Sequence, residues 1–174
     1  MQRERFDDPK AAPADAAHAQ RILTLLLAQD GSTTRLCETI ARGPVDLLVL
    51  RQEVTSEVPA IVREVLPGTQ FIERVTSLAA HGQVMMDNIA YIALDGLSGD
   101  LRRDLEDGTL PIGHLLARLW VRRARLPDAT ALQDRLWGLV GQPDAPATRA
   151  YSITTPEGAR MVIAETYRRG MLMG

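Results

Sequence analysis

The sequence has little of what cross-links a protein or inserts it into a membrane. It contains one cysteine, Cys37, which excludes an internal disulfide and fits a reducing compartment. Its longest apolar run, ILTLLLA, has seven residues, whereas a membrane-spanning helix needs ~20. The first 20 residues contain no apolar segment of the kind that signal peptides carry. We therefore expect a cytoplasmic protein with no membrane contact.

The sequence is also poor in the residues that bind metals, nucleotides and nucleic acids. Three scattered histidines and one cysteine predict no zinc site. No glycine-rich phosphate loop is present, since Gly96 and Gly99 lack the required spacing. The net charge of −2 predicts no general attraction to nucleic acid. Any anionic ligand must therefore be held by a local group of donors.

What the chain does have is enough apolar material for a core. Hydrophobic residues make up 45% of its 174 residues, while aromatic residues make up only 4%, so the core must be mostly aliphatic. This length suits one domain. Residues 1–15 are polar and rich in alanine and proline, which predicts a flexible tail. We expect a single domain over residues 16–174 and a monomer.

The order of elements predicts an α+β fold. Helices are expected over 16–29 and 33–42, followed by a strand over 46–54 and a short helix or turn within 56–67. Two strand-like runs flank His81-Gly82, which indicates a hairpin. Helices over 98–108, from Pro111 to about 126, and over 128–140 come next. Two strands joined by residues 156–158 close the chain. Hairpins and clustered helices predict an antiparallel sheet with helices covering a face.

Two charged residues stand in apolar rows of predicted strands. Because strand side chains alternate, Arg74 shares a face with Ile72 and Leu78. Its planar guanidinium suits a carboxylate partner. Glu165 likewise shares a face with Ile163, and burial can tune a carboxyl group toward acid–base work. The ordinary alternatives for Arg74 are an exposed position on an edge strand or an internal salt bridge. Those for Glu165 are a pair with an arginine or a strand face that is partly exposed to water.

Two predicted helix starts and one arginine cluster add candidates. The segments GSTT (31–34) and LPIG (110–113) each present free backbone N–H groups, which attract anions and also serve ordinary capping. Arginines at 118, 122, 123 and 125 follow with apolar residues between them. This cluster is predicted to be the solvated face of an amphipathic helix.

Four segments, taken in their order along the chain, resemble the chorismate–pyruvate lyase family. The residues that carry the resemblance are LLLAQDGSTTRLCE (25–38), the segment from Arg74 to Leu78, LPIGHLL (110–116) and MVIAETY (161–167). The resemblance spans about residues 25–168. It implies an antiparallel sheet with flanking helices and a buried pocket. It also implies an enzyme that converts chorismate to 4-hydroxybenzoate and pyruvate without any cofactor.

The resemblance also implies roles for particular residues. Arg74 matches an arginine that clamps a substrate carboxylate, and Glu165 matches the carboxyl group that assists proton movement. The backbone N–H groups of Ser32 and Ile112 match donors at the carboxylate site. Asn88 stands where ubiquinone-pathway members carry a second arginine. Since asparagine cannot neutralise an anion, Arg149 is the candidate for the compensating charge.

Three other functions remain open at this point. A non-catalytic domain that binds small aromatic carboxylates could use the same fold, as could an enzyme with an altered substrate that Asn88 permits. A purely structural protein is disfavoured by the polar groups within apolar strand rows.

Overall fold

The computed structural model describes residues 1–7, 12–109, 111–117, 119–156 and 158–172. Leu110, Arg118 and Glu157, which belong to predicted segments, lie outside this part of the chain, as do residues 8–11 of the predicted tail. The helices are α1 (Pro13–Ala28), α2 (Thr33–Ala41), α3 (Ala60–Val65), α4 (Gly99–Asp107), α5 (Ile112–Leu116) and α6 (Thr130–Val140). The strands are β1 (Asp46–Thr55), β2 (Phe71–Ala80), β3 (Gln83–Ala93), β4 (Arg122–Arg125), β5 (Thr148–Thr155) and β6 (Gly158–Tyr167).

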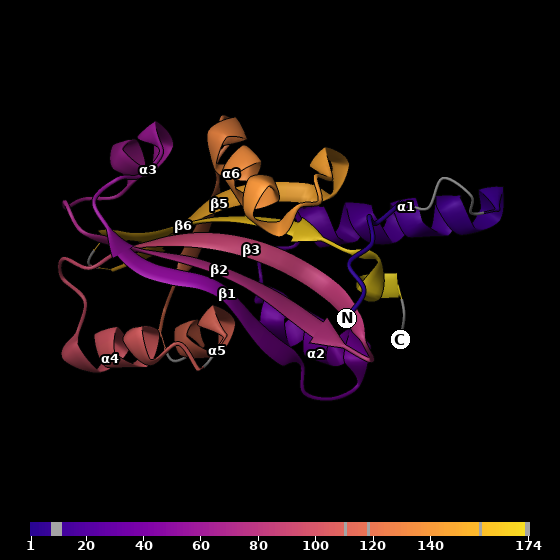
Figure 1. The fold of residues 1–174 in the computed structure, drawn as a ribbon, viewed down its shortest axis with the longest axis horizontal. Coiled ribbons are helices and arrows are strands. Elements are labelled where there is room, and N and C mark those ends of the chain that lie inside the picture. The colour runs from indigo at the N-terminus through magenta and orange to yellow at the C-terminus, as the bar shows by residue number, and fades with distance from the viewer. Residues whose placement is uncertain (8–11, 110, 118, 157, 173–174) are drawn as a thin grey trace.

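The six strands form one antiparallel sheet in the order β1-β2-β3-β6-β5-β4 (Figure 1). The α+β prediction is confirmed. The predicted hairpin of β2 and β3 is also confirmed, and its turn has positive φ values of 51° at His81 and 76° at Gly82. Two successive positive φ values match the twist that joins antiparallel strands directly.

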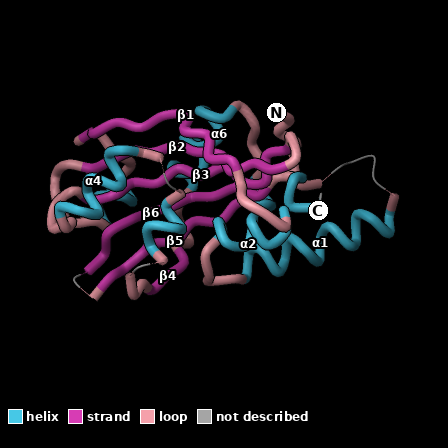
Figure 2. Tube along the Cα trace, turned by 90° about the horizontal axis from the view of Figure 1, so that it is seen from below, coloured by secondary structure: helices cyan, strands magenta, loops and turns pink. Residues whose placement is uncertain are grey.

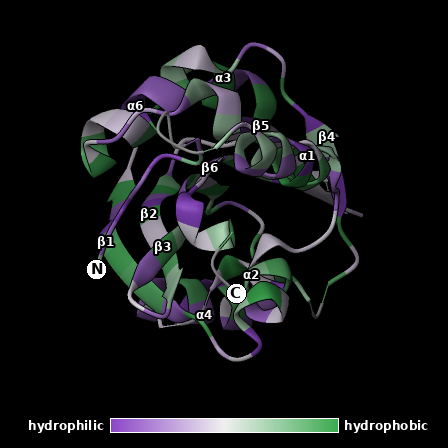
Figure 3. Cartoon of the chain, turned by 90° about the vertical axis from the view of Figure 1, so that its right-hand side faces the viewer, coloured by the Kyte–Doolittle hydropathy of each residue, from purple (hydrophilic) through white to green (hydrophobic). Residues whose placement is uncertain are grey.

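Helices cover both faces of the sheet, where the sequence predicted cover on one (Figures 1 and 3). On one face, α3 and α6 pack Val62 and Leu132 against Val75 of β2 and its neighbours. On the opposite face, α4 and α5 pack on Ile92 of β3, while α1 and α2 pack around Tyr167. The central strands are therefore buried on both sides, and alternate residues of each strand belong to different cores.

The N-terminal segment packs on the fold, although the sequence predicted that residues 1–15 offer nothing to bury. The side chain of Phe6 is fully buried, and its N–H donates to the Asp144 carboxylate over 2.8 Å. Gln2 bridges to Gln83 at the start of β3. A single aromatic residue in a polar segment gives no periodicity, so only the site that receives Phe6 reveals its role. Helix α1 also begins earlier than predicted, at Pro13.

The prediction of a long helix after Pro111 is wrong. Helix α5 ends at Leu116, and residues 122–125 form strand β4, which pairs with β5 at the edge of the sheet. Arginine and leucine favour helices, but pairing with β5 satisfies the backbone groups of β4 instead. The arginines of β4 therefore alternate between the two faces of a strand and do not line one side of a helix.

Cys37 is a buried core thiol, as the helix pattern predicted. Its Sγ lies 3.7 Å from the sulfur of Met171. Burial, with the nearby charge of Glu165, raises the pKa of this thiol, so it stays protonated and weakly reactive at neutral pH. Across the described residues, no helix is both long and apolar enough to cross a membrane.

Candidate functional site

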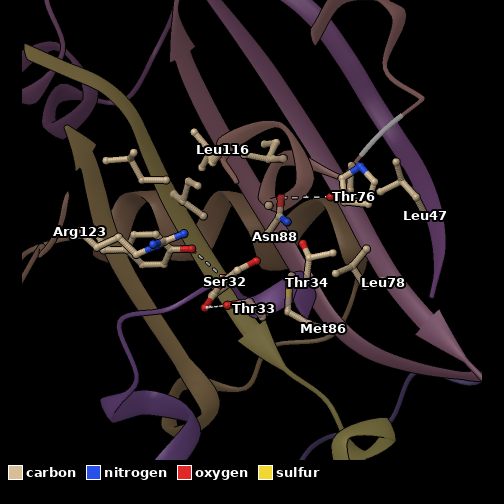
Figure 4. Close-up of a pocket in the computed structure, with 17 residues that line it drawn as sticks. Ser32, Thr33, Thr34, Leu47, Thr76, Leu78, Met86, Asn88, Leu116 and Arg123 are labelled. Atoms are coloured by element: carbon tan, nitrogen blue, oxygen red, sulfur yellow. Dashed lines mark hydrogen bonds between the residues drawn. The ribbon is translucent and has the colours of Figure 1, made fainter. Parts of the chain in front are cut away.

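A small cavity lies between the sheet and the starts of α2 and α5 (Figure 4). Its lining combines hydroxyl, amide and charged groups with an apolar wall. The lining residues are Ser32, Thr33, Thr34, Leu47, Thr76, Leu78, Met86, Asn88, Pro111, Ile112, Gly113, Leu116, Arg123, Tyr151, Ile153, Ile163 and Glu165. The cavity volume is about 30 Å³, which has room for only two or three water molecules at about 10–15 Å³ each.

Four polar residues form a row across the floor of this site. In the strand register, Thr76 of β2 lies beside Asn88 of β3, Asn88 lies beside Glu165 of β6, and Glu165 lies beside Arg149 of β5. Directly paired residues on neighbouring strands point to the same face. The fold therefore brings together two parts of the chain, 76–88 and 149–165, that the sequence separates.

Glu165, between Asn88 and Arg149 in this row, accepts a full set of hydrogen bonds. Its side chain is almost completely buried, and the Arg149 guanidinium lies 2.6 Å from Oε1. The hydroxyl groups of Thr33, Tyr151 and Tyr167 donate to the carboxylate over 2.8, 3.0 and 3.0 Å. Charged hydrogen bonds of this kind are strong. Glu165 is thus held as an ion-paired acceptor between the sheet and the first residue of α2.

The protonation of the surrounding donors follows from the same arrangement. Burial raises the pKa of Tyr151 and of Tyr167, and the negative charge of Glu165 raises both further. Burial lowers the pKa of Arg149, but Glu165, Tyr167 and Tyr151 together more than offset it, so this pKa lies above its usual value. All three groups therefore remain proton donors to Glu165 at neutral pH.

Arg149 connects this row to the end of α1. Its Nη1 donates to the main-chain oxygen of Gln29, just beyond α1. The guanidinium also lies 5.2 Å from the centre of the Tyr151 ring and 5.6 Å from that of Tyr167, distances at which a cation is attracted to an aromatic face. Arg149 was the candidate charge for a substrate carboxylate. In the structure it neutralises Glu165 instead and is not among the described residues that line the cavity.

Arg74 lies on the same face of the sheet as Glu165 but one row away. Its register partners are Ala90 on β3 and Gln52 on β1. The side chain is fully buried, and Nη2 donates to the main-chain oxygen of Gly108 over 2.9 Å. Burial lowers the pKa of this guanidinium. Arg74 therefore binds the connection between α4 and α5 and is not among the described residues that line the cavity.

The other three predicted site residues do line the cavity. Ser32 caps α2 by accepting a hydrogen bond from the Arg35 N–H over 3.4 Å, and Ile112 begins α5. Asn88 accepts a hydrogen bond from Thr76 over 3.2 Å. The two helix starts named in the sequence thus lie side by side, and the amide of Asn88 lies beneath them (Figure 4).

Arg123 was assigned to a solvated helix face, yet it lines the cavity from β4. Its Nη1 donates to the main-chain oxygen of Asp30 over 3.1 Å. Its Nε is buried and has no hydrogen-bond partner within the described ranges, and no carboxylate there pairs with it. Recognising residues 122–125 as a strand would have placed this side chain on the face that carries Tyr151 and Ile153. Thr33 and Tyr151 were also missed, because their only signal is proximity to Glu165 in space.

The contact between the two helix starts depends on Gly113. A Cβ at this position would lie 2.4 Å from Thr34 Oγ1 and 2.7 Å from Ser32 Oγ. We expect Gly113→Ala to lower the free energy of unfolding by about 1–3 kcal/mol through overpacking, measured by urea unfolding. The control is Gly138→Ala in α6, where an added Cβ would have no neighbour within 4 Å outside the local helix backbone. Removing this helical glycine should be stabilising by roughly 0.5–1 kcal/mol. Equal effects at both positions would contradict the close approach of α2 and α5.

The described residues contain no group of three histidine, cysteine or acidic side chains placed to hold a metal ion. The polar groups at the cavity are hydroxyls, one amide, one ion-paired carboxylate and Arg123. Such groups can orient a ligand by hydrogen bonds and neutralise one negative charge.

Comparison with known proteins finds likeness at the level of structure. No family model and no curated protein matches the sequence. PhnF from Mycobacterium smegmatis is 15% identical, with a TM-score of 0.49, covering 97% of this chain and 89% of that one. The C-terminal domain of the histidine utilization repressor from Pseudomonas syringae is 7% identical, with a TM-score of 0.48 and coverage of 71% and 91%. The ligand-binding domain of a GntR-family transcriptional regulator from Bordetella bronchiseptica is 12% identical, with a TM-score of 0.42 and coverage of 72% and 83%.

Proposed function

We propose that this chain binds a small monocarboxylate in the cavity beside Glu165 and carries out no reaction on it. The observation that supports this is the charge balance of the site. Arg149 neutralises Glu165 at 2.6 Å, which leaves Arg123 as the cation without a carboxylate among the described lining residues. The Nε of Arg123 is buried and has no hydrogen-bond partner among the described residues. A buried donor needs a partner, so a ligand with one negative charge completes the site.

The rest of the lining indicates which groups the ligand carries besides its carboxylate. Ser32, Thr34 and Asn88 offer hydroxyl and amide groups, while an apolar wall that includes Leu116 and Ile163 faces them. This combination of an apolar wall and a few polar groups is typical of small-molecule sites. It suits an aromatic or aliphatic carboxylate that carries a further polar substituent, and 4-hydroxybenzoate is a suitable probe.

The size of the cavity adds a condition to this proposal. A volume of about 30 Å³ is smaller than any such carboxylate, so binding requires the side chains at the starts of α2 and α5 to move apart. The expected signature is a conformational change on binding, visible as a slow phase in the fluorescence of Trp120. This side chain is 70% exposed and lies between α5 and β4.

The chorismate lyase activity that the sequence resemblance implies has weaker support. An acid–base group must reach the substrate proton directly or through one water. The oxygens of Glu165 already accept hydrogen bonds from Arg149, Thr33 and two tyrosines, so a proton transfer would first have to break this network. An enzyme with an altered substrate meets the same obstacle.

Calorimetric titration with 4-hydroxybenzoate tests the proposal. We expect Arg123→Ala to weaken binding by about 1.5–3 kcal/mol, at least tenfold, because it removes a charged hydrogen-bond donor. The control is Arg122→Ala, since Arg122 is exposed and points to the other face of β4. Loss of binding in both variants, or in neither, contradicts the assignment of Arg123.

A second measurement separates binding from catalysis. The pure protein is incubated with chorismate, and pyruvate and 4-hydroxybenzoate are assayed. We expect no release above the uncatalysed rate. Product formation that Glu165→Gln reduces by about 10²–10⁴ would replace the binding proposal with the lyase.

A further inference from the structure

A second cavity lies on the far side of Arg123 and Tyr151, between the end of α1 and the strands β4 and β5. Its volume is about 240 Å³, and its polar lining consists of Gln29, Asp30, Arg123, Arg125, Arg149 and Tyr151. Figure 2 shows α1, β4 and β5 around this part of the molecule. This cavity is distinct from the first, because Arg125 and the end of α1 line only the second cavity.

The charges around this cavity are unbalanced. Arg149 is neutralised by Glu165. Arg123 uses one nitrogen on the main-chain oxygen of Asp30 and keeps its buried Nε unpaired. The Arg125 side chain makes no hydrogen bond or ion pair with any residue that the structure describes. Two guanidinium groups, from Arg123 and Arg125, therefore face the exposed Asp30 as the one carboxylate of the described lining.

The strand places these two arginines together. Arg123 and Arg125 are two residues apart on β4, opposite Ile153 and Tyr151 of β5, so both point to the face of the sheet that carries Glu165. Charged residues on an edge strand also prevent unwanted pairing with other chains. That role explains an exposed arginine such as Arg122, but it does not explain a buried, unpaired Nε at a cavity wall.

We infer that the second cavity binds an oxyanion, with the phosphate group of a small monoester as the best match. Arg123 and Arg125 against the single carboxylate of Asp30 leave an excess of positive charge in the described lining, and the planar arrays of donors on the two guanidinium groups suit phosphate oxygens. The volume of about 240 Å³ lies below the ~300–1,000 Å³ of sites for drug-sized ligands. The ligand is therefore a phosphate with a short organic group or the free ion.

The experiment is a titration of the full chain with inorganic phosphate at constant ionic strength, followed by calorimetry. We expect Arg125→Ala to weaken phosphate binding at least tenfold. Arg122→Ala, which removes an exposed arginine of the opposite face from the same strand, should change it less than twofold. Acetate, with one charge, should bind at least tenfold more weakly than phosphate to the unaltered protein. Phosphate binding that is absent, or equal in the unaltered protein and Arg125→Ala, overturns the inference.

The two sites share Arg123, so the test of this inference is made on Arg125. Arg125 is exposed and lines only the second cavity, so Arg125→Ala should fold normally and bind 4-hydroxybenzoate as the unaltered protein does. A melting temperature within 2 °C of the unaltered protein, about what a 0.5 kcal/mol change produces, checks the folding. Tight phosphate binding with no carboxylate binding would overturn the proposed function and leave this site standing.

Discussion

Arg149→Ala should lower the free energy of unfolding by about 3–5 kcal/mol, because it leaves the buried Glu165 carboxylate without its countercharge. Glu165 is 1% exposed, and Arg149 is 7% exposed. The same arginine also holds the main-chain oxygen of Gln29 beyond α1. Urea unfolding at pH 7 measures the loss, and the midpoint concentration should fall with little change in slope.

Two controls separate the buried charge from a general effect of removing an arginine. In Arg149→Met combined with Glu165→Gln, both charges are gone, so much of the lost stability should return. Arg103→Ala removes an arginine that pairs with Asp100 on the surface of α4 and is 73% exposed. Such exposed pairs contribute little. If Arg149→Ala and Arg103→Ala unfold at the same urea concentration, Glu165 is not a buried partner of Arg149.

Asp87 lies on the opposite face of the sheet. Asp87→Ala should also lower the free energy of unfolding by about 3–5 kcal/mol. The Asp87 carboxylate accepts from Nε of Arg168 over 2.7 Å, and both side chains are fully buried. Arg3 donates to the same carboxylate over 3.1 Å. Removing Asp87 leaves the Arg168 guanidinium buried without a carboxylate and removes the bond that Arg3 of the N-terminal segment makes to β3.

The two variants should differ in ligand binding. Asp87 and Asn88 are adjacent on β3, so their side chains point to opposite faces, and only Asn88 lines the cavity. At temperatures where it is folded, Asp87→Ala should bind 4-hydroxybenzoate as well as the unaltered protein. Arg149→Ala should bind it at least tenfold more weakly, because Glu165, which lines the cavity, loses its countercharge and repels a carboxylate ligand. Equal affinities in these two variants would show that the row from Thr76 to Arg149 does not shape the site.

Local signals in the sequence predicted most elements correctly. Alternation and the His81-Gly82 turn predicted β2 and β3, and Ser32 predicted the start of α2. These features depend on interactions between residues a few positions apart. Local patterns failed for residues 122–125, where arginine and alanine favour a helix. Strand β4 exists because β5, more than 20 residues further along the chain, supplies its hydrogen bonds.

At the site, the sequence predicted that Glu165 is buried but not which residue pairs with it. Alternation along β6 correctly put this carboxylate in an apolar row, which makes a partner necessary. It could not say which arginine is the partner. Arg74 and Arg149 both share the face of Glu165, but β5 is the neighbour of β6 in the sheet, whereas β3 lies between β6 and β2.

The sequence by itself therefore determined the α+β class, the hairpins, the capped start of α2 and the presence of charged residues within buried strands. Periodicity and local backbone chemistry are sufficient for these features. Only the tertiary structure decided that Glu165 pairs with Arg149, that Gly113 lies against α2, and that Arg123 lines both cavities. Strand order and helix contacts join residues far apart in the sequence, such as Thr33 and Glu165, whose hydrogen bond spans 132 positions. Such contacts form only when the whole sheet assembles, so no local pattern encodes them.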